Sequence, residues 1–191
     1  MENLLAPLAE ARAGEFAREL IGRFGSLGQA MRAASPEHTA VRSEALQILG
    51  AAQALVRAAC AETIAGSPVD ALDPALGEHL RLRLGFASEE MAVAIHVDAA
   101  GGYAGEQVLA QGGVDSVPVP VRQIVRRALE LGSRSILLAH NHPSGRPLPS
   151  ARDYEVTDQL RSALRTVEIG LLDHLVVTRR SVFSMQAGVS T

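Results

Sequence analysis

The sequence has 191 residues, is 47% hydrophobic and carries a formal net charge of −3 at pH 7. This length allows one sizeable core, alone or with a small helical appendage, and argues against two full-sized domains. The acidic balance, with no Trp, two Tyr and four Phe, excludes a general attraction to nucleic acid and offers few rings for stacking bases. The single cysteine, Cys60, excludes a disulfide framework and is typical of a reducing compartment.

The first residues include acids and lack the basic segment and apolar core of a secretory signal. By inspection, no apolar stretch approaches the ~18 residues that a membrane span needs. We therefore expect a cytoplasmic protein that does not enter a membrane.

Residues 1 to about 65 are predicted to be helical, because apolar residues recur at helical spacing, as in Phe16, Leu20 and Phe24. Gly25 is expected to end that helix. A second, long helix is expected to start at residues 35–37 (Ser-Pro-Glu), which combine a capping Ser, a first-turn Pro and an early acid. Prolines and aspartates place a linker near 65–74. The sequence thus predicts a helical domain over residues 1–70.

From Glu90 onward, short apolar runs alternate with amphipathic segments. Two strands flank a Gly-rich turn as a hairpin, a helix follows Pro120, and a buried strand leads to a helix that Ser150 caps, before two closing strands. The predicted strands are residues 91–98, 103–113, 135–141, 170–178 and 181–185. Strands that alternate with helices indicate an α/β fold.

Two histidines stand where the buried strand 135–141 ends. In an extended backbone residues i and i+2 point the same way, so His140 and His142 can converge on one ion. A Pro- and Gly-rich loop then leads to Ser150 and Asp153. Two imidazoles, one carboxylate and a water are a common catalytic zinc shell. The alternative for Ser150 and Asp153 is a helix capping box, which the spacing also fits.

A metal-bound water also needs a carboxylate nearby that accepts its proton. The candidates are Glu89, Glu90 and Glu106. Glu90 directly precedes the strand 91–98, whereas Glu106 lies inside the second strand of the hairpin, where a solvent-facing role is expected. Spacing alone therefore favours Glu90, and a plain surface acid remains the alternative for it.

The segment His140-Asn141-His142-Pro143, followed by Ser150-x-x-Asp153, resembles the JAMM (MPN-type) metalloprotease motif with each spacing kept. More narrowly, "LAHNHPSGRPLPSARD" and "LLDHLVV" resemble the bacterial RadC family. The resemblance implies an α/β/α sandwich of JAMM/MPN (cytidine-deaminase-like) type over about residues 75–188, after a small all-helical N-terminal domain.

The same resemblance implies a site and an activity. His140, His142 and Asp153 would be zinc ligands, Glu90 the general acid/base and Ser150 a hydrogen-bond donor to the tetrahedral intermediate. The implied activity is a zinc-dependent metallohydrolase that cleaves a peptide or isopeptide bond of a protein substrate with a metal-activated water.

Two further residues lie near this motif in the sequence. His174 in "LLDHLVV" falls outside the ligand pattern, so we expect it behind the ligands or as a satisfied core histidine, with Asp173 as its hydrogen-bond partner.

The alternative function is a DNA-repair-associated or DNA-binding accessory protein, because RadC proteins are named for DNA repair and usually begin with a helix-hairpin-helix region. Residues 1–70 resemble a degenerate form of that region. Ser43, Glu44 and Ala45 stand where its Gly-x-Gly turn would grip a phosphate, and Glu44 would repel one. We therefore do not expect strong duplex DNA binding. The helical region could instead pair with a second copy as a homodimer.

Overall fold

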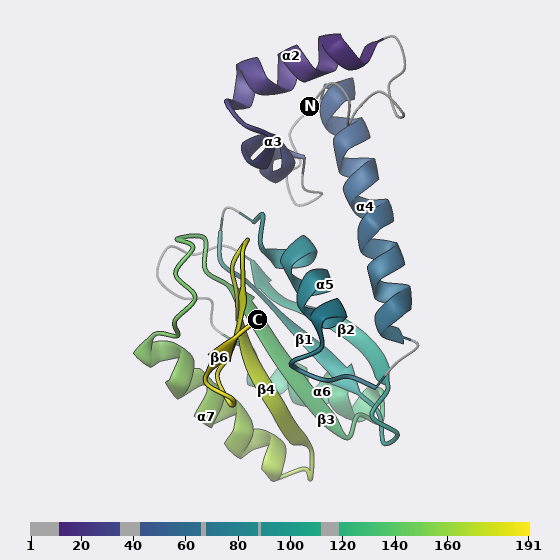
Figure 1. Cartoon of the computed structure of the whole chain (residues 1–191). Helices are drawn as coiled ribbons and strands as arrows, with labels where there is room; N and C mark the ends of the chain where they lie inside the picture. The colour runs from purple at the N-terminus through teal and green to yellow at the C-terminus, as the bar shows by residue number, and fades with distance from the viewer. Residues whose placement is uncertain (1–11, 35–42, 66–67, 88, 112–118) are drawn as a thin grey trace. The chain divides into compact units, whose positions relative to one another are not determined.

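The computed structural model describes residues 12–34, 43–65, 68–87, 89–111 and 119–191 (Figure 1). The chain divides into two compact units, residues 1–58 and 59–191. Each unit is described by itself below.

The described part of the first unit is helical. It holds α2 (Ala13–Phe24), α3 (Leu27–Ala33) and the first part of α4 (Glu44–Ala65), whose buried apolar residues form one cluster around Phe16 and Leu20. Gly25 ends α2 with a φ of +74°, and its backbone N–H donates to the Ile21 carbonyl at 2.7 Å. This left-handed conformation suits glycine, so the predicted end of the helix is confirmed. The predicted helix start at residues 35–37 lies outside the described residues.

Helix α4 corrects one expectation from the sequence. It is long and apolar enough to cross a membrane, by length and composition alone. Its apolar character comes from many alanines and scattered aliphatic residues rather than from one continuous apolar block, so the sequence pattern alone did not indicate it. One such helix is weak evidence for a membrane span.

The second unit is built on a six-stranded sheet. Its strands are β1 (Met91–Val97), β2 (Tyr103–Gln111), β3 (Ser135–Asn141), β4 (Gly170–Val177), β5 (Val182–Ser184) and β6 (Val189–Ser190), in the order β2-β1-β3-β4-β5-β6. Only β3 and β4 pair in parallel, and the other neighbours are antiparallel. The predicted hairpin and the other predicted strands are confirmed. The two-residue β6 was not predicted.

Helices cover both faces of this sheet (Figure 1). Alternate residues of β1 point to opposite sides, so Val93 and Ile95 pack with apolar residues of α5 (Pro74–Leu84). Ala92 and Ala94 pack instead with α6 (Val121–Glu130) and α7 (Ala151–Arg165). The unit is therefore a mixed α/β structure with the sheet between two apolar layers. The predicted helices after Pro120 and after Ser150 are confirmed.

Helix α5 was not expected, although its start carries a signal. The Asp73 side chain caps the helix by accepting the Ala75 backbone N–H at 2.8 Å, and Pro74 occupies the first helical position. The linker predicted to end at residue 74 therefore leads directly into a helix.

Candidate metal centre

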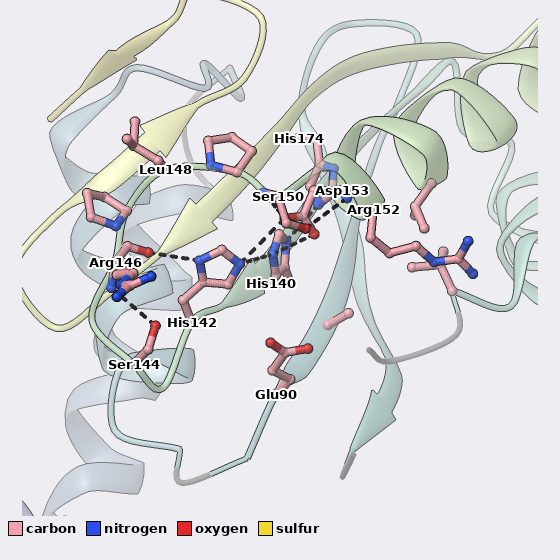
Figure 2. A pocket seen from close by; sticks show the side chains of 15 residues that line it. Glu90, His140, His142, Ser144, Arg146, Leu148, Ser150, Arg152, Asp153 and His174 are labelled. Atoms are coloured by element: carbon pink, nitrogen blue, oxygen red, sulfur yellow. Dashed lines mark hydrogen bonds and ion pairs between the residues drawn. The ribbon is translucent and has the colours of Figure 1, made fainter. Parts of the chain in front are cut away.

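The two histidines of the predicted motif lie together where β3 ends, on the face that α7 covers. His140 Nε2 and His142 Nε2 are 3.0 Å apart (Figure 2). Asp153 approaches from α7, with Oδ1 at 3.1 Å from His140 Nε2 and Oδ2 at 3.6 Å from His142 Nε2. One ligand atom from each residue lies within 4.8 Å of the other two.

The loop after β3 fixes the direction of the His142 ring. The His142 backbone N–H donates to the Val177 carbonyl at 3.0 Å, which continues the pairing with β4. A turn follows in which the Gly145 N–H donates to the His142 carbonyl, with Gly145 at φ +78°. This turn brings the Arg146 carbonyl to 2.8 Å from His142 Nδ1. Because a carbonyl only accepts, Nδ1 carries the proton and Nε2 offers a lone pair to the site.

Asp153 is held by the start of helix α7. Ser150 and Asp153 form the capping box that the spacing allowed: Ser150 Oγ accepts the Asp153 N–H at 3.3 Å, and Asp153 Oδ2 accepts the Ser150 N–H at 2.6 Å. Ser150 Oγ also donates to Asp153 Oδ2 at 2.7 Å. The local interpretation and the metal interpretation of these two residues are therefore compatible, because the cap orients the carboxylate toward the histidines.

This set of atoms fits a zinc ion. Ligands bound at ~2.05 Å in a tetrahedron lie about 3.3 Å apart, close to the separations of 3.0 to 3.6 Å between the two Nε2 atoms and the carboxylate. Nitrogen donors favour zinc over magnesium or calcium, which prefer oxygen ligands. Acceptor atoms that face one another at this distance repel unless a cation or a proton lies between them.

The charges of the cluster agree with a cation site. Burial alone would raise the pKa of Asp153, but hydrogen bonds from His140 and His142 in their protonated forms, which carry a proton on Nε2, hold that pKa well below its usual range. The hydrogen bond with Asp153 also raises the pKa of His142. Asp153 is therefore ionised, and its negative charge favours any cation bound between the three side chains.

Glu90 faces the histidines across the same cavity (Figure 2). It directly precedes β1, and its half-buried position is set by a residue that the sequence reasoning did not select. Asn141, with 1% of its surface exposed, accepts the Met91 N–H at 2.7 Å and donates to the Glu89 carbonyl at 3.1 Å. Both neighbours of Glu90 are thereby tied to the strand that carries the two histidines.

The other two candidate carboxylates lie elsewhere. Glu89 is exposed and is not among the residues that line the cavity. Glu106 lies on the opposite face of the sheet, where it accepts from His79 Nε2 at 3.1 Å and from Arg83 Nε at 3.0 Å. Its side chain is therefore largely buried against α5, and the solvent-facing position expected for Glu106 is wrong. Its partner in β1, Ile95, belongs to the same apolar layer as α5.

His174 lies behind the predicted ligands in β4. Its Nε2 is 2.8 Å from His140 Nδ1, and its Nδ1 is 2.6 Å from Thr157 Oγ1. Burial lowers the pKa of His174 to about 3, so this ring is neutral.

Asp173 is not the partner of the His174 ring, contrary to the expectation. Successive residues of a strand point to opposite faces, so the Asp173 side chain lies on the other side of β4. There it accepts from the His174 and Gln186 backbone N–H groups and from the Ser184 hydroxyl.

The site opens into a cavity of about 620 Å³. Its polar lining includes Glu90, His140, His142, Ser150, Asp153 and His174, and the loop after β3 and helix α7 add Arg146, Leu148, Arg152 and Val156. A titratable carboxylate, a set of metal-binding atoms and a partly apolar wall thus share one concave surface, which is the usual form of a catalytic site.

A family model described as a RadC-like JAB domain matches residues 73–189. A UPF0758 protein of Burkholderia mallei (strain SAVP1) is 38% identical over 176 residues, which cover 90% of this chain and 63% of that protein. A UPF0758 protein of Paraburkholderia phytofirmans is also 38% identical over 176 residues, with 88% and 66% covered. The chain thus spans about 63% of the length of the first of these relatives.

Proposed function

Because this chain belongs to the RadC family, with its RadC-like JAB domain, we propose that it is a zinc-dependent hydrolase that cleaves a peptide or isopeptide bond. The observation that carries the proposal is the convergence of His140 Nε2, His142 Nε2 and the Asp153 carboxylate beside Glu90 in one cavity. The proposed fold type is the JAMM/MPN (cytidine-deaminase-like) sandwich, and the proposed location is the cytoplasm.

His140, His142 and Asp153 would hold the ion. A zinc ion bound there supplies a water whose pKa is lowered toward ~7 and polarises a substrate carbonyl. The His142 imidazole keeps its proton on Nδ1, so its Nε2 is ready to coordinate. The Asp153 carboxylate contributes the negative charge that an all-imidazole set would lack.

Glu90 would move the proton. Its carboxylate faces the histidines without belonging to the ligand set, so it can accept a proton from the attacking water and deliver it to the leaving nitrogen. Asn141 would keep Glu90 in place through the backbone on either side of it.

Ser150 is the proposed hydrogen-bond donor to the oxyanion of the tetrahedral intermediate. Its hydroxyl lines the cavity and donates to Asp153 Oδ2. This second role requires the hydroxyl proton to turn from the carboxylate toward the substrate when the oxyanion forms.

The test compares the three glutamates in the zinc-loaded full chain. Glu90→Gln should reduce cleavage ~10²- to 10⁴-fold, the usual effect of removing a positioned acid/base, while zinc content and folding stay unchanged. The substrates are fluorogenic peptide libraries with either α-peptide or lysine isopeptide linkages. Glu89→Gln is the matched control, because it changes the adjacent, exposed carboxylate and should retain activity.

Glu106→Gln should also retain activity at a temperature where it is folded, since this side chain lies on the other face of the sheet. Loss of cleavage in Glu106→Gln with full activity in Glu90→Gln would show that the proposed acid/base has been assigned to the wrong strand. Failure of the zinc-loaded wild type to cleave either linkage would contradict the proposed function.

A further inference from the structure

A chain of hydrogen bonds runs behind the candidate metal centre and connects two of its ligands. It passes from His140 Nδ1 to His174 Nε2 at 2.8 Å, and from His174 Nδ1 to Thr157 Oγ1 at 2.6 Å. It ends with Thr157 Oγ1 at 2.5 Å from the Asp153 backbone carbonyl. These hydrogen bonds connect residues of β3, β4 and α7. Figure 2 shows His174 beside His140 and Asp153.

The three residues of this hydrogen-bond network are almost fully buried. His174 has 3% of its surface exposed, Thr157 has 5% and His140 has 8%. Buried polar groups of this kind depend on one another for their hydrogen bonds, so the proton positions follow from the partners alone.

The positions of the protons follow from the hydrogen bond between Thr157 Oγ1 and the Asp153 carbonyl. The Thr157 hydroxyl and the Asp153 carbonyl oxygen are 2.5 Å apart, and two oxygens this close repel unless a hydrogen lies between them; since the carbonyl cannot donate, that hydrogen is the one on Thr157 Oγ1. The Met185 sulfur at 3.9 Å is a much weaker acceptor, and donation to His174 Nδ1 would leave the Thr157 and Asp153 oxygens facing each other without a hydrogen. Thr157 Oγ1 can therefore only accept from His174, whose proton is on Nδ1.

The proton position of His174 then determines that of His140. A neutral imidazole carries one N–H, so His174 Nε2 is an acceptor and His140 must donate to it from Nδ1. The lone pair of His140 is thereby left on Nε2, the atom that faces His142 and Asp153.

We propose that Thr157 and His174 are positioning residues that lock His140 in the tautomer able to bind a metal, and tie that ligand to the helix that carries Asp153. The proposal rests on the proposed zinc site. It assigns to Thr157, four residues after Asp153, a role in metal binding that the sequence motif does not contain.

Both histidines thus carry their proton on Nδ1 and a lone pair on Nε2, but different partners hold the two rings in this tautomer. His142 is oriented by one carbonyl of the loop that follows β3, whereas His140 is oriented through two side chains from β4 and α7. Without the Thr157 hydroxyl, a proton on His174 Nδ1 would lose its partner at 2.6 Å and keep only the weaker interaction with the Asp153 backbone carbonyl. The His174 ring would then favour a proton on Nε2, which forces the His140 proton onto the atom that must coordinate.

The experiment compares Thr157→Val, which removes the hydroxyl at nearly constant shape, with Thr157→Ser, which restores it. Thr166→Val is the matched control, because the Thr166 hydroxyl also donates to a carbonyl of α7, that of Ala163 at 2.7 Å, but at the far end of the helix. Zinc affinity of the full chain is measured by competition with a chromophoric chelator. Ring ¹⁵N NMR of the metal-free protein reports which nitrogen of His174 carries the proton.

The wild type, Thr157→Ser and Thr166→Val should show His174 protonated on Nδ1 and similar zinc affinities. Thr157→Val should move the proton to Nε2 and weaken zinc binding ~10- to 100-fold, the usual effect of losing a partner behind a ligand. A wild-type His174 protonated on Nε2 would overturn the proposal without any variant, even if Thr157→Val failed to fold.

The two proposals fail in different ways. Unchanged zinc affinity in Thr157→Val, beside normal binding by the wild type, would overturn the role of Thr157 and His174 and leave the metal centre standing. A wild type that binds no zinc would overturn the metal centre, and with it the role of this chain of residues in binding.

Discussion

Glu90 and Glu106 show that the face of the sheet on which a side chain lies decides what it contacts. Both glutamates lie near β1 in space, yet Glu90 opens onto the cavity while Glu106 pairs with His79 and Arg83 beneath α5. Spacing favoured Glu90, but the sequence could not place Glu106 on its buried face, because the register of the hairpin determines which face each residue occupies. The i and i+2 rule, by contrast, was sufficient to place His140 and His142 together.

Sequence patterns could not reveal the roles of Asn141 and Thr157, because key groups that they contact lie on other elements. Asn141 stands between the histidines, and period two turns it away from them, but nothing local indicates that it holds the backbone beside Glu90. Thr157 lies one helical turn after Asp153, a spacing that places both on one face of α7. Its partner His174, however, is contributed by a different element.

The Glu106 cluster predicts a pH-dependent term in stability. Burial opposes the charge of Glu106, but hydrogen bonds from His79 and the charge of Arg83 lower its pKa in the folded state below the ordinary 4.5. Because the folded pKa is the lower one, ionisation stabilises the fold above about pH 4.5, and this contribution is lost as the pH falls further. Glu106→Gln should therefore reduce the free energy of unfolding by about 1 to 3 kcal/mol at pH 7.

Urea unfolding of wild type and Glu106→Gln between pH 7 and pH ~3 measures this difference. It should shrink steadily below pH 4.5. Glu130→Gln is the control, because Glu130 makes only exposed ion pairs with Arg126 and Arg127 and its loss should cost little. A difference for Glu106→Gln that is constant or grows toward low pH would refute the assigned pairing.

Among the elements, α7 connects local structure most directly to the site. Its first turn is a capping box, and the same Asp153 that completes the cap faces the two histidines. Its start and the strands of the second unit were predictable, because caps and apolar runs are local signals. Helix α5 was missed despite its Asp73 cap, because its buried side mixes leucines with Gly77 and His79 and so does not form a clear apolar stripe.

The dual role of the α7 start predicts that two variants will separate capping from coordination. Ser150→Ala should lower the stability of the metal-free protein by about 1 kcal/mol, the usual value of a cap, and weaken zinc binding far less than Asp153→Asn, because the Ser150 backbone N–H still holds Asp153 Oδ2. Asp153→Asn should have a similar effect on stability but should also weaken zinc binding strongly, because it removes the charged ligand. Ser150→Thr keeps the hydroxyl and serves as the control.

Thermal unfolding and chelator competition measure the two effects. Wild-type zinc affinity in Asp153→Asn would exclude this carboxylate from the ligand set. Unchanged stability in Ser150→Ala would show that the cap contributes nothing to the helix start.

For the whole molecule, the RadC-like JAB domain accounts for the site, whereas the N-terminal helices have no assigned role. Their described residues do not favour DNA. Glu44 lies at the start of α4 and pairs with Arg12, which also pairs with Glu15, so two acids neutralise that arginine. The acidic net charge of −3 adds a weak repulsion from phosphates.

We therefore predict that the full chain binds duplex DNA more weakly than ~1 µM at ~150 mM salt, within or beyond the range of non-specific affinity. Fluorescence anisotropy with a labelled duplex, repeated at ~50 mM salt, measures both the affinity and its salt dependence. Sub-micromolar binding at the higher salt concentration would contradict this prediction and support a DNA-binding function.

The central claim is that one zinc ion binds through His140, His142 and Asp153. Its most direct test is elemental analysis of the purified full chain after dialysis, with zinc counted per chain for the wild type, His142→Ala and His79→Gln. His79 lies on the opposite face of the sheet and is the control. We predict about one zinc per chain in the wild type and in His79→Gln, and almost none in His142→Ala, which leaves only two of the three protein ligands. Full zinc occupancy in His142→Ala would contradict the account.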